Sequence, residues 1–216
     1  MVYVIIPVKN EKNNIGKVLS RIPKKYNVIV VDDGSTDNTS AVVKSFGFKT
    51  IILEKNQGKA NACKVGVDYI NKTNPKSELI IFMDGDAQHD PKDIPKIVKK
   101  LNKNDLVIGY RDLKAMSIQR QLSNKFARKL INYITKKDFK DVLCGFRGIK
   151  KTKFQLLNIE RSGYEFEAEM IIKAIKNKFK IDNVPVRTIK CTKGMPFLKS
   201  MGLGFYLISE VIKRVV

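Results

Sequence analysis

The first 110 residues alternate between short apolar runs and amphipathic segments, and this alternation constrains the fold more than any other feature of the chain. The apolar runs are typical of buried strands and lie at residues 2–8, 28–31, 49–53, 78–83 and 105–110. The segments between them have helical spacing or helix-start signals and lie at residues 13–22, 36–46, 56–71 and from Pro91 onward. Strands that alternate with helices of this length predict an α/β fold with a doubly wound, mostly parallel sheet and right-handed crossovers.

The pattern is less regular after residue 111. We expect a helix at residues 117–133, a loop with a short strand at 141–151, a helix at 164–179 and a strand at 181–189. Pro185 removes a hydrogen-bond donor from the last strand, which favours a place at the sheet edge. The apolar tail at residues 198–216 carries Glu210, Lys213 and Arg214, and it predicts a C-terminal amphipathic helix.

The composition leaves several classes of partner open. Lysine and arginine number 42 against 21 acids, which gives a net charge of +21 and a field that attracts nucleotides, phosphorylated lipids, anionic membranes or nucleic acid. This charge is spread along the chain, so it permits these partners without selecting one. Cys63, Cys144 and Cys191 are scattered and predict neither a disulfide framework nor a metal site, which favours a reducing cytosol. We expect no signal peptide and no membrane-spanning helix.

Polar and acidic residues follow three of the predicted strands, the first of which is followed by Lys9, Asn10 and Glu11. Asp84, Gly85 and Asp86 come directly after the run at residues 79–83, while Asp32 and Asp33 follow the run at 28–31. The carboxyl ends of parallel strands meet at one edge of a sheet, where α/β proteins bind ligands. Two carboxylates one residue apart need a neutralising partner, and Mg²⁺ typically combines one or two carboxylates with phosphate oxygens. The alternative is that Asp-Gly-Asp serves only as a turn.

Four motifs, quoted in chain order, carry a resemblance to a known family: Ile6-Pro7-Val8-Lys9-Asn10-Glu11, Val31-Asp32-Asp33-Gly34-Ser35-Thr36-Asp37, Asn56-Gln57-Gly58-Lys59-Ala60-Asn61-Ala62 and Asp84-Gly85-Asp86-Ala87-Gln88. Their order and spacing resemble the family-2 glycosyltransferases, and within them the dolichyl-phosphate mannose synthases and polyprenyl-phosphate glycosyltransferases. The resemblance covers roughly residues 2 to 186. Neither a Gly-x-Gly-x-x-Gly fingerprint nor a P-loop is present, which argues against a dinucleotide site or an ordinary nucleotide-triphosphate loop.

The resemblance implies a Rossmann-like, glycosyltransferase A-type catalytic domain over residues 1–197, followed by the helix at 198–216. Residues 1–110 would form the nucleotide-binding half and residues 111–197 the acceptor-binding half. It also implies a Mg²⁺ or Mn²⁺ ion on Asp84, Asp86 and Gln88. The expected nucleotide-binding residues stand at the strand ends and in the loop before the third helix: Pro7, Val8, Asn10, Glu11, Val31, Asp33, Gly34, Ser35, Gly58, Lys59, Asp84 and Gly85.

The catalytic residues that we expect are Asp86, Arg111, Arg120 and Asp141. Planar guanidinium groups bind phosphate oxygens bidentately, so arginines suit the donor or acceptor phosphates. The residues expected to meet the acceptor phosphate are Arg120, Arg147, Lys190 and Lys193. Mannose synthases usually carry an Arg where this chain has Cys191, a departure that leaves the donor sugar open.

The implied reaction is the inverting transfer of a hexose from a GDP- or UDP-sugar to dolichyl or another polyprenyl phosphate. A phosphate monoester has a second pKa near ~6, so such an acceptor needs little help from a general base. A sugar-hydroxyl acceptor, the main alternative, would need one. Asp141 and the glutamates at 165–169 are candidates, although these glutamates also suit the solvated first turn of a helix.

The implied location is peripheral, on the cytosolic face of the cell membrane, where the C-terminal helix or residues 117–133 would meet an anionic surface. That helix would equally suit packing on the domain or on another subunit. A sugar-nucleotide pyrophosphorylase is disfavoured by the loop after the first strand. A nucleic-acid-binding module is suggested only by the charge, and we expect no nucleic acid as a partner. The sequence leaves the oligomeric state open.

Overall fold

A seven-stranded sheet runs through the middle of the molecule in the order β3-β2-β1-β4-β6-β5-β7. The computed structural model describes residues 1–161, 163, 165–189 and 202–210. Within them the strands are β1 (Val2–Val8), β2 (Asn27–Asp32), β3 (Lys49–Ile52), β4 (Leu79–Phe82), β5 (Leu106–Tyr110), β6 (Arg147–Lys150) and β7 (Ile181–Pro185). All neighbours pair in parallel except β6, which is antiparallel to both β4 and β5. The predicted doubly wound, mostly parallel sheet is therefore confirmed.

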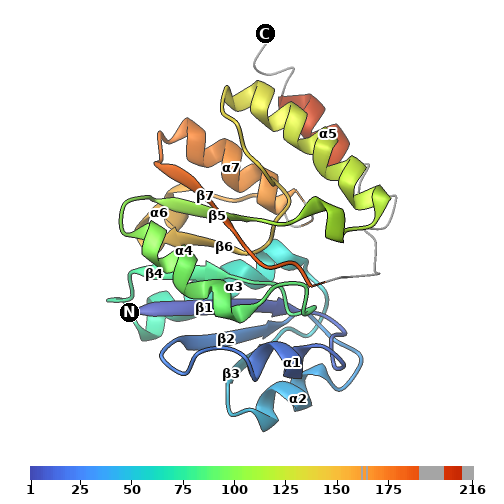
Figure 1. Cartoon of the computed structure of the whole chain (residues 1–216). Coiled ribbons are helices and arrows are strands. Elements are labelled where there is room, and N and C mark those ends of the chain that lie inside the picture. Colours follow the sequence, from blue (N-terminus) through green and yellow to red (C-terminus); the bar gives the residue numbers. More distant parts are fainter. Residues whose placement is uncertain (162, 164, 190–201, 211–216) are drawn as a thin grey trace.

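Helices cover both faces of this sheet (Figure 1). Their bounds are α1 (Ile15–Leu19), α2 (Thr39–Ser45), α3 (Lys59–Thr73), α4 (Ile94–Leu101), α5 (Ile118–Thr135), α6 (Lys151–Leu156) and α7 (Phe166–Lys176). Two short 3₁₀ turns lie at Pro91–Asp93 and Leu113–Ala115. Helices α1, α2 and α4 pack on one face, and α3, α6 and α7 pack on the other, with α5 resting beside α7.

Side-chain alternation along each strand builds two cores. In β1, Tyr3 and Ile5 enter the core beneath α3, whereas Val4, Ile6 and Val8 enter the core beneath α1. This period of two on a strand that is buried on both faces explains why the sequence shows continuous apolar runs rather than alternation with polar residues.

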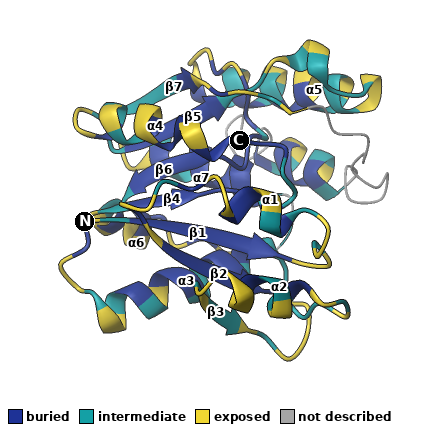
Figure 2. Ribbon diagram, turned by 60° about the horizontal axis from the view of Figure 1, so that its bottom comes forward, coloured by how far each residue is buried: buried dark blue, intermediate teal, exposed yellow. Residues whose placement is uncertain are grey.

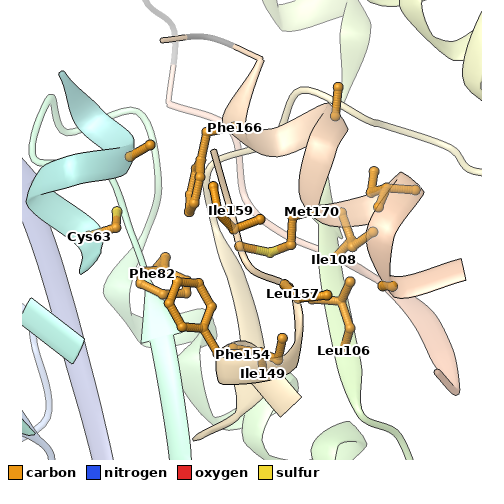
Figure 3. Packing of buried hydrophobic residues seen from close by; sticks show 14 of the residues in the cluster. Cys63, Phe82, Leu106, Ile108, Ile149, Phe154, Leu157, Ile159, Phe166 and Met170 are labelled. Carbon is orange, nitrogen blue, oxygen red and sulfur yellow. The ribbon is translucent and has the colours of Figure 1, made fainter. Parts of the chain in front are cut away.

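Three aromatic rings pack together in the first core, where Phe82 is the last residue of β4 (Figure 3). The Phe82 ring contacts Phe154 at a centroid distance of 5.3 Å and Phe166, edge to face, at 5.9 Å. Phe82 comes two residues before Asp84, and Phe166 comes directly before Glu167. The cluster therefore fixes the backbone of two segments that carry acidic residues to the same edge of the sheet, since such aromatic pairs stabilise by about 0.5–1.5 kcal/mol beyond their buried area.

The C-terminal part of the chain differs in detail from the expectation. Residues 202–210 are helical, and Leu203, Tyr206 and Leu207 are buried in the first core. This stretch thus packs on the domain, which is one of the alternatives given above for the tail. The rest of the predicted helix at 198–216, and the boundary at 197, lie outside the described residues.

Exposed apolar residues gather on α5, where yellow bands mark its outward side in Figure 2. Ile118 is 76% exposed, Leu122 61% and Phe126 50%. The opposite side of the same helix buries Asn124, Ala127, Ile131 and Thr135. In the part of the chain that the structure describes, every helix falls short of the length and apolar character needed to cross a membrane.

Candidate active site

A pocket of about 620 Å³ opens at the carboxyl ends of β1, β2 and β4 and extends toward α5 and α7. Its walls come from both halves of the chain. The lining residues are Pro7, Val8, Lys9, Glu11, Asp33, Asn56, Gly58, Lys59, Asp84, Gly85, Asp86, Gln88, Arg111, Met116, Arg120, Ser123, Asn124, Leu143, Gly163, Glu165, Glu167 and Gly202. The strand-end residues predicted from the sequence are thus largely brought together.

One end of the pocket is held by Asp33, which follows β2 and is buried. Its two carboxylate oxygens accept hydrogen bonds from the backbone N–H groups of Gln57, at 2.7 Å, and Gly58, at 2.9 Å. Gly58 has a φ of 91°, a left-handed conformation that favours glycine. Asp33 therefore fixes the loop before α3. The carboxylate that it presents to the pocket already accepts two hydrogen bonds from that loop.

Four of the predicted nucleotide-binding residues do not line the pocket. Val31 is fully buried within β2, where it pairs with Pro7 and packs in the core. Asn10, Gly34 and Ser35 lie in the loops behind the pocket wall, where the Asn10 N–H donates to Ser35 Oγ at 2.9 Å. Asn10, Gly34 and Ser35 therefore belong to the contact between the loops after β1 and β2, and their expected contact with the nucleotide stays a prediction.

At the centre of the pocket, Lys59 forms two ion pairs. Its Nζ lies 2.5 Å from Asp84 Oδ1 and 2.5 Å from Glu167 Oε1. Burial alone would raise the pKa of Asp84, but the Lys59 ammonium outweighs it and lowers that pKa to about 2. The His89 ring lies 4.0 Å from the other Asp84 oxygen, and burial lowers its pKa to about 4, so it stays neutral. Asp84 is thus held ionised by a lysine that sequence reasoning assigned only to the nucleotide.

Asp86 has the opposite environment. Burial first, and then the charge on Asp84, raise its pKa to about 6. Its carboxylate accepts hydrogen bonds from the side-chain amide and the backbone N–H of Gln88. The Gln88 oxygen in turn accepts a hydrogen bond from Arg120 on α5. This chain of contacts connects the loop after β4 to helix α5. It also engages the Gln88 oxygen, so a metal ion would have to share or displace this contact, and the expected role of Gln88 as a metal ligand stays a prediction.

The pair Asp84 and Asp86 fits a hard divalent cation that has an incomplete set of protein ligands. Within the described residues, no group of three or more His, Cys, Asp or Glu side chains could hold a metal ion by itself. Both carboxylates line the pocket, and the pKa of Asp86 is raised first by burial and then by the charge on Asp84. Such a pair matches the chemistry of an ion whose coordination is completed by phosphate and water. The donor set suits Mg²⁺ or Mn²⁺ and is too small for a closed structural site.

Arg111 lines the pocket and pairs with the buried Asp141. The Arg111 Nε and NH2 groups donate to the two Asp141 oxygens at 2.7 and 3.1 Å, and the Asp141 side chain is fully buried. Burial would raise the pKa of Asp141, but Arg111 lowers it. Only Arg111 lines the pocket. The Asp141 carboxylate positions Arg111 and does not itself line the pocket, and its expected catalytic role stays a prediction.

Arg147 is also removed from the site. It is fully buried in β6, and its guanidinium donates to the carbonyl oxygens of Cys144, at 2.6 Å, and Glu167, at 2.9 Å. These contacts hold the loop before β6 against the start of α7. This arrangement contradicts the expectation of a phosphate contact from Arg147. Lys190 and Lys193 lie outside the described residues.

The α5 side of the pocket contains residues that sequence reasoning missed. Helix α5 contributes Ser123 and Asn124 beside the expected Arg120, and Leu143 and Met116 add apolar surface. Arg120 and Asn124 are four residues apart, so they share one face of the helix. That spacing was the signal available in the sequence.

The comparisons with known proteins agree with this geometry. A family model described as glycosyl transferase family 2 matches residues 3–157, and the chain belongs to this family of glycosyltransferases. The chain is 45% identical over 161 residues to an uncharacterised protein of Methanocaldococcus jannaschii, covering 68% of this chain and 70% of that protein.

Two other relatives are named for polyprenyl phosphates. The dodecaprenyl-phosphate galacturonate synthase of Rhizobium johnstonii is 31% identical over 160 residues, which cover 67% of this chain and 46% of the relative. The UDP-N-acetylglucosamine–dolichyl-phosphate N-acetylglucosaminyltransferase of Methanococcus voltae is 27% identical over 245 residues, which cover 98% of this chain and 95% of the relative.

Solved structures share the fold. Glucosyl-3-phosphoglycerate synthase from Mycobacterium tuberculosis, crystallised with Mn²⁺, UDP and glucosyl-3-phosphoglycerate, has a TM-score of 0.78 over 99% of this chain and 79% of its own, at 18% identity. At this identity the match defines the fold, and it confirms the glycosyltransferase A-type architecture.

Proposed function

We propose that this glycosyltransferase uses Mg²⁺ or Mn²⁺ to bind a UDP- or GDP-sugar and transfers the hexose, with inversion, to dolichyl phosphate or another polyprenyl phosphate. The observation that carries the proposal is the distribution of charge around the pocket. Asp84 and Asp86 line the pocket together with the basic side chains of Lys59, Arg111 and Arg120. A diphosphate bound to a metal ion carries negative charge, and a pocket that combines two carboxylates for the ion with basic groups for the phosphates accommodates such a ligand.

The residues have separate tasks in this mechanism. Asp84 and Asp86 would hold the cation, which, when bound, acts as a Lewis acid toward the departing nucleoside diphosphate. Lys59 keeps Asp84 ionised and oriented through its 2.5 Å contact. Arg111, fixed by Asp141, and Arg120, fixed by Gln88, stabilise phosphate charge as the sugar–phosphate bond breaks. Because these groups are held before the ligand arrives, little reorganisation accompanies the reaction.

The acceptor assignment draws on the relatives and on the pocket. Dodecaprenyl and dolichyl phosphate occur in the names of the two relatives described above. A phosphate monoester is largely ionised at neutral pH, so it attacks without a general base. Arginines on the acceptor side suit this anion, and the pairing of Asp141 with Arg111 is compatible with it.

The outward face of α5 supports a peripheral position at the cytosolic face of a membrane. Ile118, Leu122 and Phe126 recur every four residues on this face, with the exposed Lys125 and Lys129 between and beside them. Apolar side chains flanked by lysines suit the interface of an anionic bilayer. The inward face of the same helix lines the pocket, so a lipid acceptor could reach Arg120 while its chain stays in the bilayer.

Ligand-dependent thermal unfolding tests the donor and the metal together. UDP-glucose, UDP-N-acetylglucosamine and GDP-mannose would each be added to the whole chain with and without Mn²⁺. One donor at 100 times its dissociation constant should stabilise the fold by about 2.7 kcal/mol, and only when Mn²⁺ is present. For a chain of 216 residues, this corresponds to a rise in Tm of about 5–10 °C.

Asp86→Ala should abolish the metal-dependent rise and the turnover, while circular dichroism reports an intact fold. Asp68→Asn is the matched control, since Asp68 is exposed on α3 and does not line the pocket. If Asp86→Ala retains the Mn²⁺-dependent rise in Tm, the metal assignment fails.

Glu165 supports a second candidate function, transfer to a sugar hydroxyl. It lines the acceptor side of the pocket, and no salt bridge to it occurs among the described residues. A carboxylate so placed could act as a general base, which a hydroxyl acceptor requires. Glu165→Gln should leave transfer to polyprenyl phosphate within about threefold of wild type, whereas a hydroxyl-directed enzyme would lose about 100-fold or more.

A further inference from the structure

Asn124 is a buried amide whose hydrogen-bonding groups are unused by the protein. The residue is 2% exposed, and neither its Oδ1 nor its Nδ2 has a hydrogen-bond partner among the described residues. It nevertheless lines the pocket. Most buried polar atoms in proteins are paired, and an unpaired one costs about 1–3 kcal/mol. A donor and an acceptor kept unpaired in a pocket wall are available to a ligand.

The position of Asn124 relative to the diphosphate site indicates which part of the ligand it would meet. It follows Arg120 by one helical turn on the same face of α5. Arg120 is connected through Gln88 to Asp86. Asn124 therefore lies one turn along α5 from the residue that contacts the proposed metal-binding loop, and both residues line the same pocket. A sugar attached to a diphosphate bound at that loop would occupy this pocket.

The chemistry of the amide discriminates between the candidate ligands. A phosphate dianion offers only acceptors, so it would satisfy Nδ2 and leave Oδ1 buried and unpaired. A sugar hydroxyl both donates and accepts, so one or two neighbouring hydroxyls satisfy both ends of the amide. We propose that Asn124 binds hydroxyl groups of the transferred sugar and so contributes to the choice of donor. This inference rests on the proposed function and names a specificity residue for the same site.

Substitution of Asn124 by an apolar residue of similar size separates sugar binding from nucleotide binding. Asn124→Leu should raise the Kd of the sugar nucleotide about tenfold or more. The leucine cannot hydrogen-bond the sugar hydroxyl, which is then buried without a partner. It should change the Kd of the bare nucleoside diphosphate less than twofold. Isothermal titration with Mn²⁺ would compare UDP with the UDP-sugar that stabilises the wild-type chain, or GDP with the GDP-sugar.

Gln119→Leu is the control for the same amide-to-leucine change on the same helix, since Gln119 is exposed and does not line the pocket. Its Kd values should match those of wild type. Asn124→Leu should also raise the Tm of the ligand-free protein, because the unpaired amide is removed. Asn124→Ser, which leaves room in the pocket, provides a second test if the leucine variant does not fold, and it should show the same selective loss.

Three results would count against the inference, and they are distinguishable. Equal losses for the bare nucleotide and the sugar nucleotide would assign Asn124 to the diphosphate or to the fold. An unchanged Kd for the sugar nucleotide, together with weaker binding of short-chain polyprenyl phosphate, would assign it to the acceptor. Absence of any nucleotide binding by the wild-type chain would overturn the proposed function itself.

Discussion

At the scale of single residues, Asp84 and Asp86 lie in opposite electrostatic environments although only one residue separates them. The pKa of Asp86 is raised to about 6, from an ordinary value of 3.8. A carboxyl whose pKa is higher in the fold contributes stability below its unfolded pKa and loses it as pH rises through the folded value. The ligand-free wild-type chain should therefore lose stability between about pH 4 and pH 6 through this group.

Asp86→Asn should remove that loss. At pH 7.5, without metal, the variant should be more stable than wild type by about 1–2 kcal/mol. Urea unfolding at pH 7.5 and at pH 4 measures the difference, which should largely disappear at the lower pH, where the wild-type carboxyl is protonated. If wild type and variant are equally stable at both pH values, the pKa of Asp86 is not raised in the folded protein. The gain in stability would accompany the loss of metal binding, as expected of a carboxylate retained for function.

Arg111 and Asp141 provide a second prediction at this scale. Asp141→Asn should destabilise the fold by about 3–5 kcal/mol, because it leaves the buried Arg111 charge without its partner. Urea unfolding at pH 7 measures this change. The double variant Arg111→Met, Asp141→Leu should recover much of the stability but none of the turnover, since it removes both charges. A single variant with wild-type stability and no turnover would instead support Asp141 as a catalytic base.

At the scale of elements, helix α5 combines two surfaces, an exposed apolar face with Leu122 and Phe126 and an inward face that lines the pocket. The double variant Leu122→Ser with Phe126→Ser tests the apolar face. It should lower binding to anionic phosphatidylglycerol vesicles at least tenfold, because burial of such a side chain contributes about 1.5–3 kcal/mol. The matched control, Ile52→Ser with Leu156→Ser, removes two side chains of similar exposure, 52% and 58%, from other elements. Co-sedimentation measures the binding, and the donor-induced rise in Tm should remain unchanged in both variants. Equal losses in the two pairs would disprove a specific role for α5.

The elements also show what the sequence can and cannot specify. The strands of the first half were predictable, because burial on both faces demands continuous apolar runs and Asp84 and Asp86 mark the end of one of them. Helix α6 and the antiparallel pairing of β6 were not predictable from the sequence. Strand β6 has only four residues, one of them Arg147, and it pairs with β4 and β5, which lie far from it in the sequence. The sequence also does not distinguish a buried arginine that donates to backbone carbonyl groups, such as Arg147, from an arginine that binds phosphate. The Arg111–Asp141 and Lys59–Glu167 pairs, 30 and 108 residues apart in sequence, leave no local signal.

At the scale of the whole molecule, the net charge of +21 acts in two opposite directions. It attracts the protein to anionic surfaces. The positive side chains also repel one another within the compact fold, which lowers its stability. Raising NaCl from 10 to 300 mM shortens the screening length from about 30 Å to less than 8 Å. Binding to anionic vesicles should therefore fall about tenfold or more over this range, while the Tm of the free protein should rise by a few degrees.

Both measurements belong to the same protein preparation, and neutral phosphatidylcholine vesicles are the control. Binding to these vesicles depends on the apolar face of α5 and should change less than twofold with salt, since no lipid charge is screened. If the charge served only to bind nucleic acid, vesicle binding would be weak at every salt concentration and would not depend on Leu122 or Phe126. A salt-dependent affinity for anionic vesicles that is lost in the α5 variant would show that charge and apolar surface act together, with the charge bringing the enzyme to the membrane and α5 holding it there beside the pocket.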